Sequence, residues 1–123
     1  MAQEYLDDLS ALLARVDPAL PPESTIEVKH FFGGAAAYVD GTIFMSLTKV
    51  GPALKLPEPD RERLFRSKEA KKLRYFPKAP VKKQYALFKK CFLEDDGALK
   101  TWIEKSVAFT LGGLDDKDAE AKR

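Results

Sequence analysis

Val28-Lys-His-Phe-Phe-Gly-Gly34, followed by Tyr38-Val-Asp-Gly41 and then Ile43-Phe44, is the stretch of sequence that decides the fold. Its Asp-Gly pair separates two apolar runs, residues 35–39 and 42–47, and this arrangement is typical of a two-residue β-hairpin turn. Such a turn would form three cross-strand pairs: Val39 with Thr42, Tyr38 with Ile43, and Ala37 with Phe44. The Gly-Gly pair interrupts the preceding strand, which predicts a turn, a bulge or a close approach of two backbones.

The rest of the chain places helices and further strands around this hairpin. The spacing of apolar residues predicts helices at 3–16, at 60–72 and from Asp95 or Asp96 to Gly112, and strands at 26–32, 53–56, 73–76 and 84–88. Strands joined by tight turns pair antiparallel, so this order predicts a two-layer α+β fold, an antiparallel sheet with helices on one face. Residues 1–113 are expected to form a single domain, and the polar residues 114–123 a flexible tail.

The ordered set of motifs resembles the N-terminal domain of the TfoX/Sxy family of competence regulators. Members of that family carry a Met-Phe-Gly-Gly run at the end of the first strand, then an Asp-Gly turn and a strand that contains Phe. Here Phe31 replaces the usual Met and keeps an apolar side chain. The resemblance covers roughly residues 3–112. Its signature residues, which have a structural role, are Phe31, Phe32, Gly33, Gly34, Asp40, Gly41 and Phe44.

The resemblance implies a fold similar to that of type III secretion chaperones. Full-length members of the family act as co-activators with the cAMP receptor protein at competence-gene promoters. They also carry a C-terminal helical domain that this sequence does not include, so only the properties of the N-terminal domain can be transferred. The family has no established catalytic residues, and its stand-alone N-terminal domains have no settled biochemical role.

A basic block is the most informative functional feature of the sequence. Residues 61–90 hold twelve Lys or Arg and two Asp or Glu, a net charge of +10 in a chain whose net charge is +2. This asymmetry favours an anionic partner, and interleaved aromatic residues such as Tyr85 and Phe88 also occur in sheets that bind single-stranded nucleic acid. The alternative, favoured by strand alternation, is a solvated basic face whose aromatic side chains point into the core. The candidate contacts to an anion or nucleic acid are Lys71, Lys72, Arg74, Lys82, Lys83, Lys89 and Lys90.

The chain's single histidine and single cysteine do not form a recognisable catalytic or metal-binding set. Alternation places His30 beside Val28 and Phe32 on an apolar face, so we expect a packed or edge histidine. Basic neighbours would favour the thiolate of Cys91, but the favoured interpretation is a small buried apolar residue near the sheet edge. A zinc site needs at least three protein ligands, so we expect no metal, no cofactor and no catalytic residue.

The sequence therefore favours a non-enzymatic regulatory or protein-interaction module, with a protein partner that the resemblance suggests belongs to the transcription machinery. The alternative is weak nucleic-acid binding through residues 61–90, and a third hypothesis is an enzyme or a binder of a small anionic ligand. Homodimer formation is left open. Residues 1–20 do not fit a signal peptide and no run approaches about eighteen apolar residues, so we expect a cytoplasmic protein without a membrane partner.

Overall fold

The computed structural model describes residues 2–31, 33–74, 78 and 80–112. These residues form three α-helices, one short 3-10 helix and six strands. In chain order they are α1 (Ala2–Val16), β1 (Ile26–Phe31), β2 (Gly34–Val39), β3 (Thr42–Thr48), β4 (Gly51–Lys55), α2 (Glu58–Ser67), β5 (Ala70–Leu73), β6 (Lys82–Phe88), η1 (Lys90–Glu94) and α3 (Asp96–Gly112). The predicted tail, residues 114–123, and Phe32, which was placed on an apolar strand face, lie outside the described residues.

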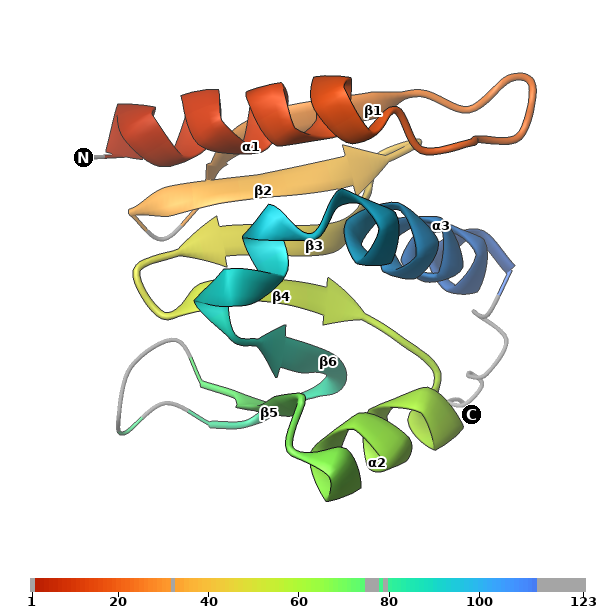
Figure 1. Ribbon diagram of the computed structural model, residues 1–123. Helices are drawn as coiled ribbons and strands as arrows, with labels where there is room; N and C mark the ends of the chain where they lie inside the picture. The colour runs from red at the N-terminus through yellow and green to blue at the C-terminus, as the bar shows by residue number, and fades with distance from the viewer. Residues whose placement is uncertain (1, 32, 75–77, 79, 113–123) are drawn as a thin grey trace.

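The six strands form one antiparallel sheet in the order β1-β2-β3-β4-β6-β5, so β1 and β5 are its two edges. The helices lie on one face of this sheet, α1 over β1 and β2, α3 over β3 and β4, and α2 beside β5 and β6 (Figure 1). The predicted two-layer α+β fold is therefore confirmed.

The main core lies between the sheet and the helices. Helical spacing brings four apolar side chains of α1 to this core, and α3 contributes three, because residues three and four apart share a helix face. The residues concerned are Leu9, Leu12, Leu13, Val16, Leu99, Ile103 and Val107. A smaller cluster of Ala53, Leu73 and Leu87 lies on the other face of the sheet, where the described chain places no helix.

The predicted hairpin turn is confirmed, and one of its three predicted strand pairs is wrong. Asp40 and Gly41 both have positive φ, 49° and 89°, as a two-residue turn of this hand requires. Val39 pairs with Thr42 and Tyr38 with Ile43, but Ala37 pairs with Met45 instead of Phe44, because the register shifts between Ala37 and Tyr38. This β-bulge leaves Phe44 and Met45 both fully buried.

The bulge is held from the helical layer. Ser106 of α3 donates a hydrogen bond from its Oγ to the carbonyl oxygen of Phe44 at 3.0 Å, and this contact is buried. A buried carbonyl without a partner costs free energy, so Ser106 stabilises the backbone at the position where the strand departs from regular pairing.

Replacing Gly41 with valine is expected to lower the free energy of unfolding by about 1–3 kcal/mol. A β-branched residue is strained at a φ of 89°, whereas space is not limiting, since no heavy atom lies within 4 Å of the position that a Cβ would take. Chemical denaturation monitored by circular dichroism measures the effect, and Gly41→Asn is the control, because asparagine tolerates positive φ. A valine variant as stable as the unmodified protein would contradict this account of the turn.

Several boundaries differ from the prediction in the region between β4 and β6. The helix predicted at 60–72 ends at Ser67, because Lys68 adopts a left-handed conformation with φ 64° and donates its backbone N–H to carbonyls of the last turn. Residues 70–72, predicted as helix, instead begin β5, where Ala70 pairs with Phe88. Tyr75 and Phe76, predicted to be strand, lie outside the described residues.

The 3-10 helix η1 was not predicted, and it explains why Cys91 is exposed and not buried as expected. Within this tight helix Phe92 and Leu93 pack against the main core, and Phe92 stacks on Phe88 with ring centroids 4.2 Å apart. Cys91 therefore faces solvent, because the two residues that follow it take the inward positions. In the described part of the chain, no helix is long and apolar enough to cross a membrane.

Candidate functional site

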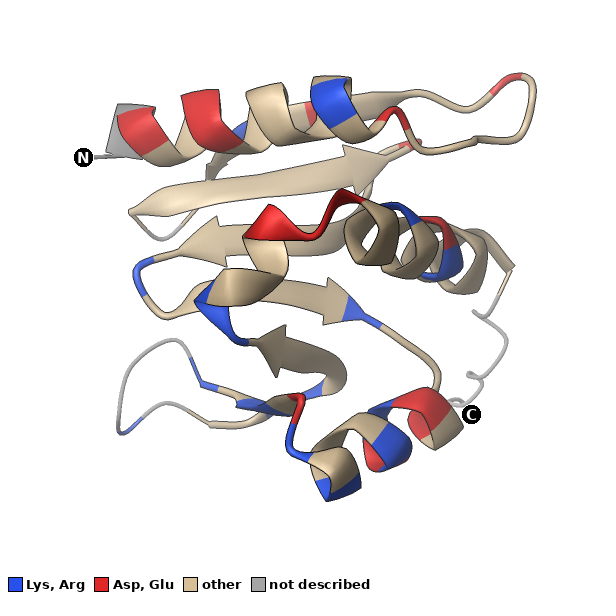
Figure 2. Cartoon of the chain, viewed as in Figure 1, with Lys and Arg blue, Asp and Glu red and all other residues tan. Residues whose placement is uncertain are grey.

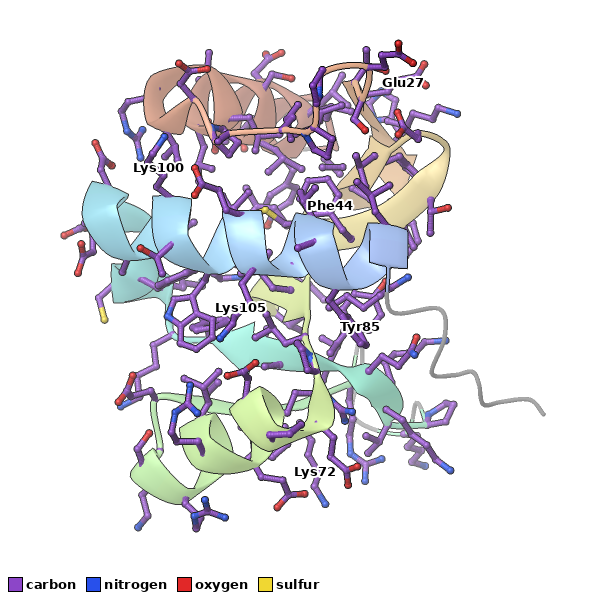
Figure 3. The ribbon with its side chains drawn as sticks, turned by 90° about the vertical axis from the view of Figure 1, so that its right-hand side faces the viewer. Glu27, Phe44, Lys72, Tyr85, Lys100 and Lys105 are labelled. Atoms are coloured by element: carbon purple, nitrogen blue, oxygen red, sulfur yellow. The ribbon has the colours of Figure 1, made fainter. Side chains whose placement is uncertain are left out.

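The basic block folds into one region of the molecule. Lys and Arg gather on β5, on β6 and on the segments that flank them, whereas α1 carries several acidic residues (Figure 2). Figure 3 shows Lys72 beside α2 and β5 and Glu27 at the opposite end of the molecule, near α1. The charge asymmetry of the sequence is therefore also an asymmetry in space.

A cavity lies inside this region at the end of β6, and we call it the basic cavity. It consists of a part of about 490 Å³ and an adjoining part of about 720 Å³ that share five lining residues: Val50, Phe65, Ala70, Lys71 and Leu87. The first part adds Phe88 and the cations Lys68, Lys89 and Lys90, and the second adds Lys72 and Arg74. The cavity thus combines an apolar floor with a cationic rim, and no Asp or Glu stands among the described residues that line either part.

The order of the strands in the sheet places the residues that line the cavity next to one another. Leu87 in β6 pairs with Ala53 of β4 on one side and with Lys71 of β5 on the other, so the turn after β3 and the end of β6 converge. Phe65 reaches the same place from the last turn of α2. Five of the seven predicted contact residues line the cavity: Lys71, Lys72, Arg74, Lys89 and Lys90.

The two other predicted contacts, Lys82 and Lys83, do not line it. They stand at the beginning of β6, at the strand end opposite to Lys89. The sequence interpretation also missed Lys68, whose signal was its place within the basic block, and the apolar residues Val50 and Phe65, for which the sequence offers no signal.

The rim lysines carry charge that the described residues do not neutralise. Within the described residues, none of them has a carboxylate oxygen within 4.0 Å: Lys68, Lys71, Lys72, Lys89 and Lys90. The nearby arginines differ, because they serve the fold. Arg63 pairs with Asp60 at 2.8 Å, and Arg61 donates to the carbonyl oxygens of Leu56 and Lys83.

Burial distinguishes Arg61 and Lys55 from the rim. Desolvation lowers the pKa of Arg61, which lies partly buried beneath the start of β6, and nearby Glu58 and Glu62 oppose that shift. Desolvation also lowers the pKa of Lys55, whose ammonium lies 5.9 Å from the ring centroid of Tyr85. Both cations are therefore partly withdrawn from solvent, in contrast to the exposed rim lysines.

The aromatic residues of the basic block do not form an exposed stacking platform in the described chain. Phe88 is 4% exposed and packs on Phe92 and near Trp102 in the core. Tyr85 is half-buried beside the smaller cluster on the open face of the sheet. The interpretation of a basic face with inward-facing aromatic residues is thus confirmed for Phe88, while Tyr75 and Phe76 lie outside the described residues.

The remaining sequence candidates have structural positions. His30 is exposed on the edge strand β1, as an edge histidine, and among the described residues no group of three His, Cys, Asp or Glu could hold a metal ion. Phe31 packs half-buried against the smaller cluster, and Gly33 takes a positive φ of 75° in the turn that Gly34 follows. Phe44 is fully buried in the main core.

Asp40 does more than form a turn. Its carboxylate accepts hydrogen bonds from the Ser24 hydroxyl at 2.7 Å and from the Thr25 backbone N–H at 3.0 Å. The backbone bond and then the hydroxyl bond lower the pKa of this carboxyl, because both favour its charged form. The proline-rich loop before β1 is thereby attached to the hairpin turn, so the role of Asp40 is structural.

Comparison with known proteins gives one match. A family model described as the TfoX N-terminal domain matches residues 10–110, which is most of the chain. Neither the curated proteins nor the solved structures that were compared contain a match. The likeness to secretion chaperones consequently stays a prediction.

Proposed function

Because the chain belongs to the TfoX N-terminal domain family, we propose that it is a non-catalytic regulatory module that binds an acidic protein partner. The observation that carries the proposal is the set of five lysines on the rim of the basic cavity that have no carboxylate partner among the described residues. An acidic partner supplies carboxylates that the described residues do not place at this rim, and charge complementarity gives specificity and speeds association. A cytoplasmic component of the transcription machinery is the partner class that we favour, given the resemblance to the competence regulators.

The burial of Phe88 favours a protein over a nucleic acid. Proteins that hold single-stranded nucleic acid stack its bases on exposed aromatic side chains, and Phe88 is packed in the core instead. Among the described residues the lysine rim has no such platform, so we expect it to bind phosphates through charge alone, and this kind of binding falls steeply with salt. Nucleic acid is therefore expected to bind weakly and without sequence preference.

Reversing the charge of Lys71 is expected to weaken partner binding about threefold to tenfold at about 150 mM salt. An exposed ion pair contributes less than about 1 kcal/mol, and reversal also adds repulsion.

The matched control is Lys29→Glu. Directly paired residues share one face of the sheet, and one such row crosses it from edge to edge: Lys29, Ala36, Ser46, Ala53, Leu87 and Lys71. The two lysines are thus exposed on the same face at opposite edges.

The measurement is affinity purification from native cells, followed by titration of the retained partner against the unmodified chain and both variants. A second arm titrates labelled DNA and RNA of random sequence at about 50 and 150 mM salt. A partner held equally well by Lys71→Glu and by the unmodified chain would contradict the proposed surface. Tight, sequence-specific nucleic-acid binding at the higher salt would replace the proposal with the nucleic-acid alternative.

A further inference from the structure

We infer that the basic cavity is a binding site for a small anionic amphiphile, a molecule with one carboxylate, sulfonate or phosphate group on an apolar body. The inference goes beyond the proposed function, because it concerns a ligand inside the cavity and can be tested without the protein partner. It rests on the composition of the cavity wall, its size and the absence of Asp and Glu from the described residues that line it.

The positive charge on the rim favours an anionic ligand. Lys68, Lys71 and Lys89 come from the end of α2, from β5 and from the end of β6, yet all three line the same part of the cavity. Like charges that converge from separate elements repel one another, and the described chain offers these ammonium groups no carboxylate within 4.0 Å. A bound anionic group would relieve this repulsion.

The floor of the cavity favours a ligand with an apolar body. Val50, Phe65 and Leu87 line both parts of the cavity, and Phe88 adds a buried ring to the first part. An inorganic anion would leave this apolar surface in contact with water, and an uncharged apolar molecule would leave the lysines without a partner. A ligand with an anionic group and an apolar body can pair with the lysines of the rim and also cover the apolar floor.

The size of the cavity fits a small molecule. Sites for small ligands in proteins enclose about 300–1,000 Å³, and each part of the basic cavity lies within that range, at about 490 and 720 Å³. The lining residues come from four elements of the fold, so the site exists only in the folded chain.

The test uses anilinonaphthalene sulfonate as the anionic probe and its uncharged parent, N-phenylnaphthylamine, as the matched neutral probe. Three variants are compared with the unmodified protein: Lys71→Gln with Lys89→Gln, which removes charge from the rim; Val50→Trp, which fills the cavity without changing charge; and Lys29→Gln, the control on the opposite edge of the sheet. Decanoate, decyl phosphate and decanol are then used as competitors to identify the preferred head group.

The anionic probe is expected to occupy one saturable site. Removing both lysines should weaken it about tenfold and change the neutral probe less than about twofold, because only the sulfonate meets the rim. Val50→Trp should weaken both probes, and Lys29→Gln neither. Decanoate or decyl phosphate should displace the probe, and whichever competes better names the head group.

Three results would overturn the inference: equal affinity for the two probes, equal loss in Lys29→Gln and in the double variant, or non-saturable binding. Should Val50→Trp fail to fold, amide chemical shifts of the unmodified, isotope-labelled protein decide the matter. Shifts confined to the cavity residues, among them Ala70 and Leu87, support the site, and shifts spread over α1 and β1 refute it. Failure here leaves the proposed partner unaffected, because partner capture is measured without the ligand.

Discussion

Replacing Phe44 with alanine is expected to lower the free energy of unfolding by about 3–5 kcal/mol. Phe44 is fully buried and is the largest of the fully buried side chains in the described chain. It lies where α3 crosses the sheet (Figure 3), so its removal leaves a cavity between two rigid layers. Such a cavity closes only partly, which is why the cost exceeds the transfer free energy of the ring.

Urea denaturation followed by tryptophan fluorescence and circular dichroism measures this effect. Phe44→Leu is the control, because it keeps an apolar side chain and is expected to cost less than about 1.5–2 kcal/mol. An alanine variant within about 1 kcal/mol of the unmodified protein would show that the bulge does not place Phe44 in the core.

Local signals in the sequence sufficed for the elements that depend on neighbouring residues. The Asp40-Gly41 turn was predicted because few residue pairs accept positive φ at two successive positions. The first helix was predicted to end at Val16, as it does, since Asp17-Pro18 prevents its continuation. Asp95 or Asp96 was expected as a cap, and it is the Asp95 side chain that accepts the backbone N–H of Ala98 at the start of α3.

Features that depend on distant residues could not be predicted in this way. The bulge at Phe44 is stabilised by a hydroxyl 62 positions away in the sequence, that of Ser106. Residues 70–72 look helical by composition, yet pairing with β6 makes them a strand, because tertiary contacts override weak propensity. The outward direction of Cys91 likewise follows from the 3-10 helix, in which Phe92 and Leu93 pack inward.

The candidate site likewise has one feature that the sequence predicted and one that it did not. Its charge was visible in the sequence, because a net charge of +10 within residues 61–90 needs no structure to be noticed. Its apolar floor was not, because Val50, Phe65 and Leu87 become neighbours only through the strand order β4-β6-β5 and the position of α2. A rim of lysines without a known floor predicts only an anionic partner, whereas the two together support the proposal of an anionic ligand with an apolar body.

Gly34→Ala is expected to destabilise the domain by about 3 kcal/mol, although it adds a single methyl group to a strand. A Cβ at this position would lie 2.5 Å from the carbonyl oxygen of Leu47 and 2.9 Å from the Cα of Thr48, and both are backbone atoms of the neighbouring strand β3. Backbone atoms cannot rotate away as a flexible side chain does, so β2 and β3 must separate or shift, and overpacking of this kind typically costs about 1–3 kcal/mol or more.

Gly33→Ala is the matched control, because it makes the same chemical change one residue earlier for a different physical reason. Nothing lies within 4 Å of its Cβ position, and only its φ of 75° disfavours alanine, at a cost of about 1–2 kcal/mol. Thermal and urea denaturation of the two variants should therefore rank Gly34→Ala as clearly the less stable. Equal losses, or a greater loss at Gly33, would mean that the Gly-Gly pair serves the turn alone and that the close approach of β2 to β3 does not restrict the second glycine.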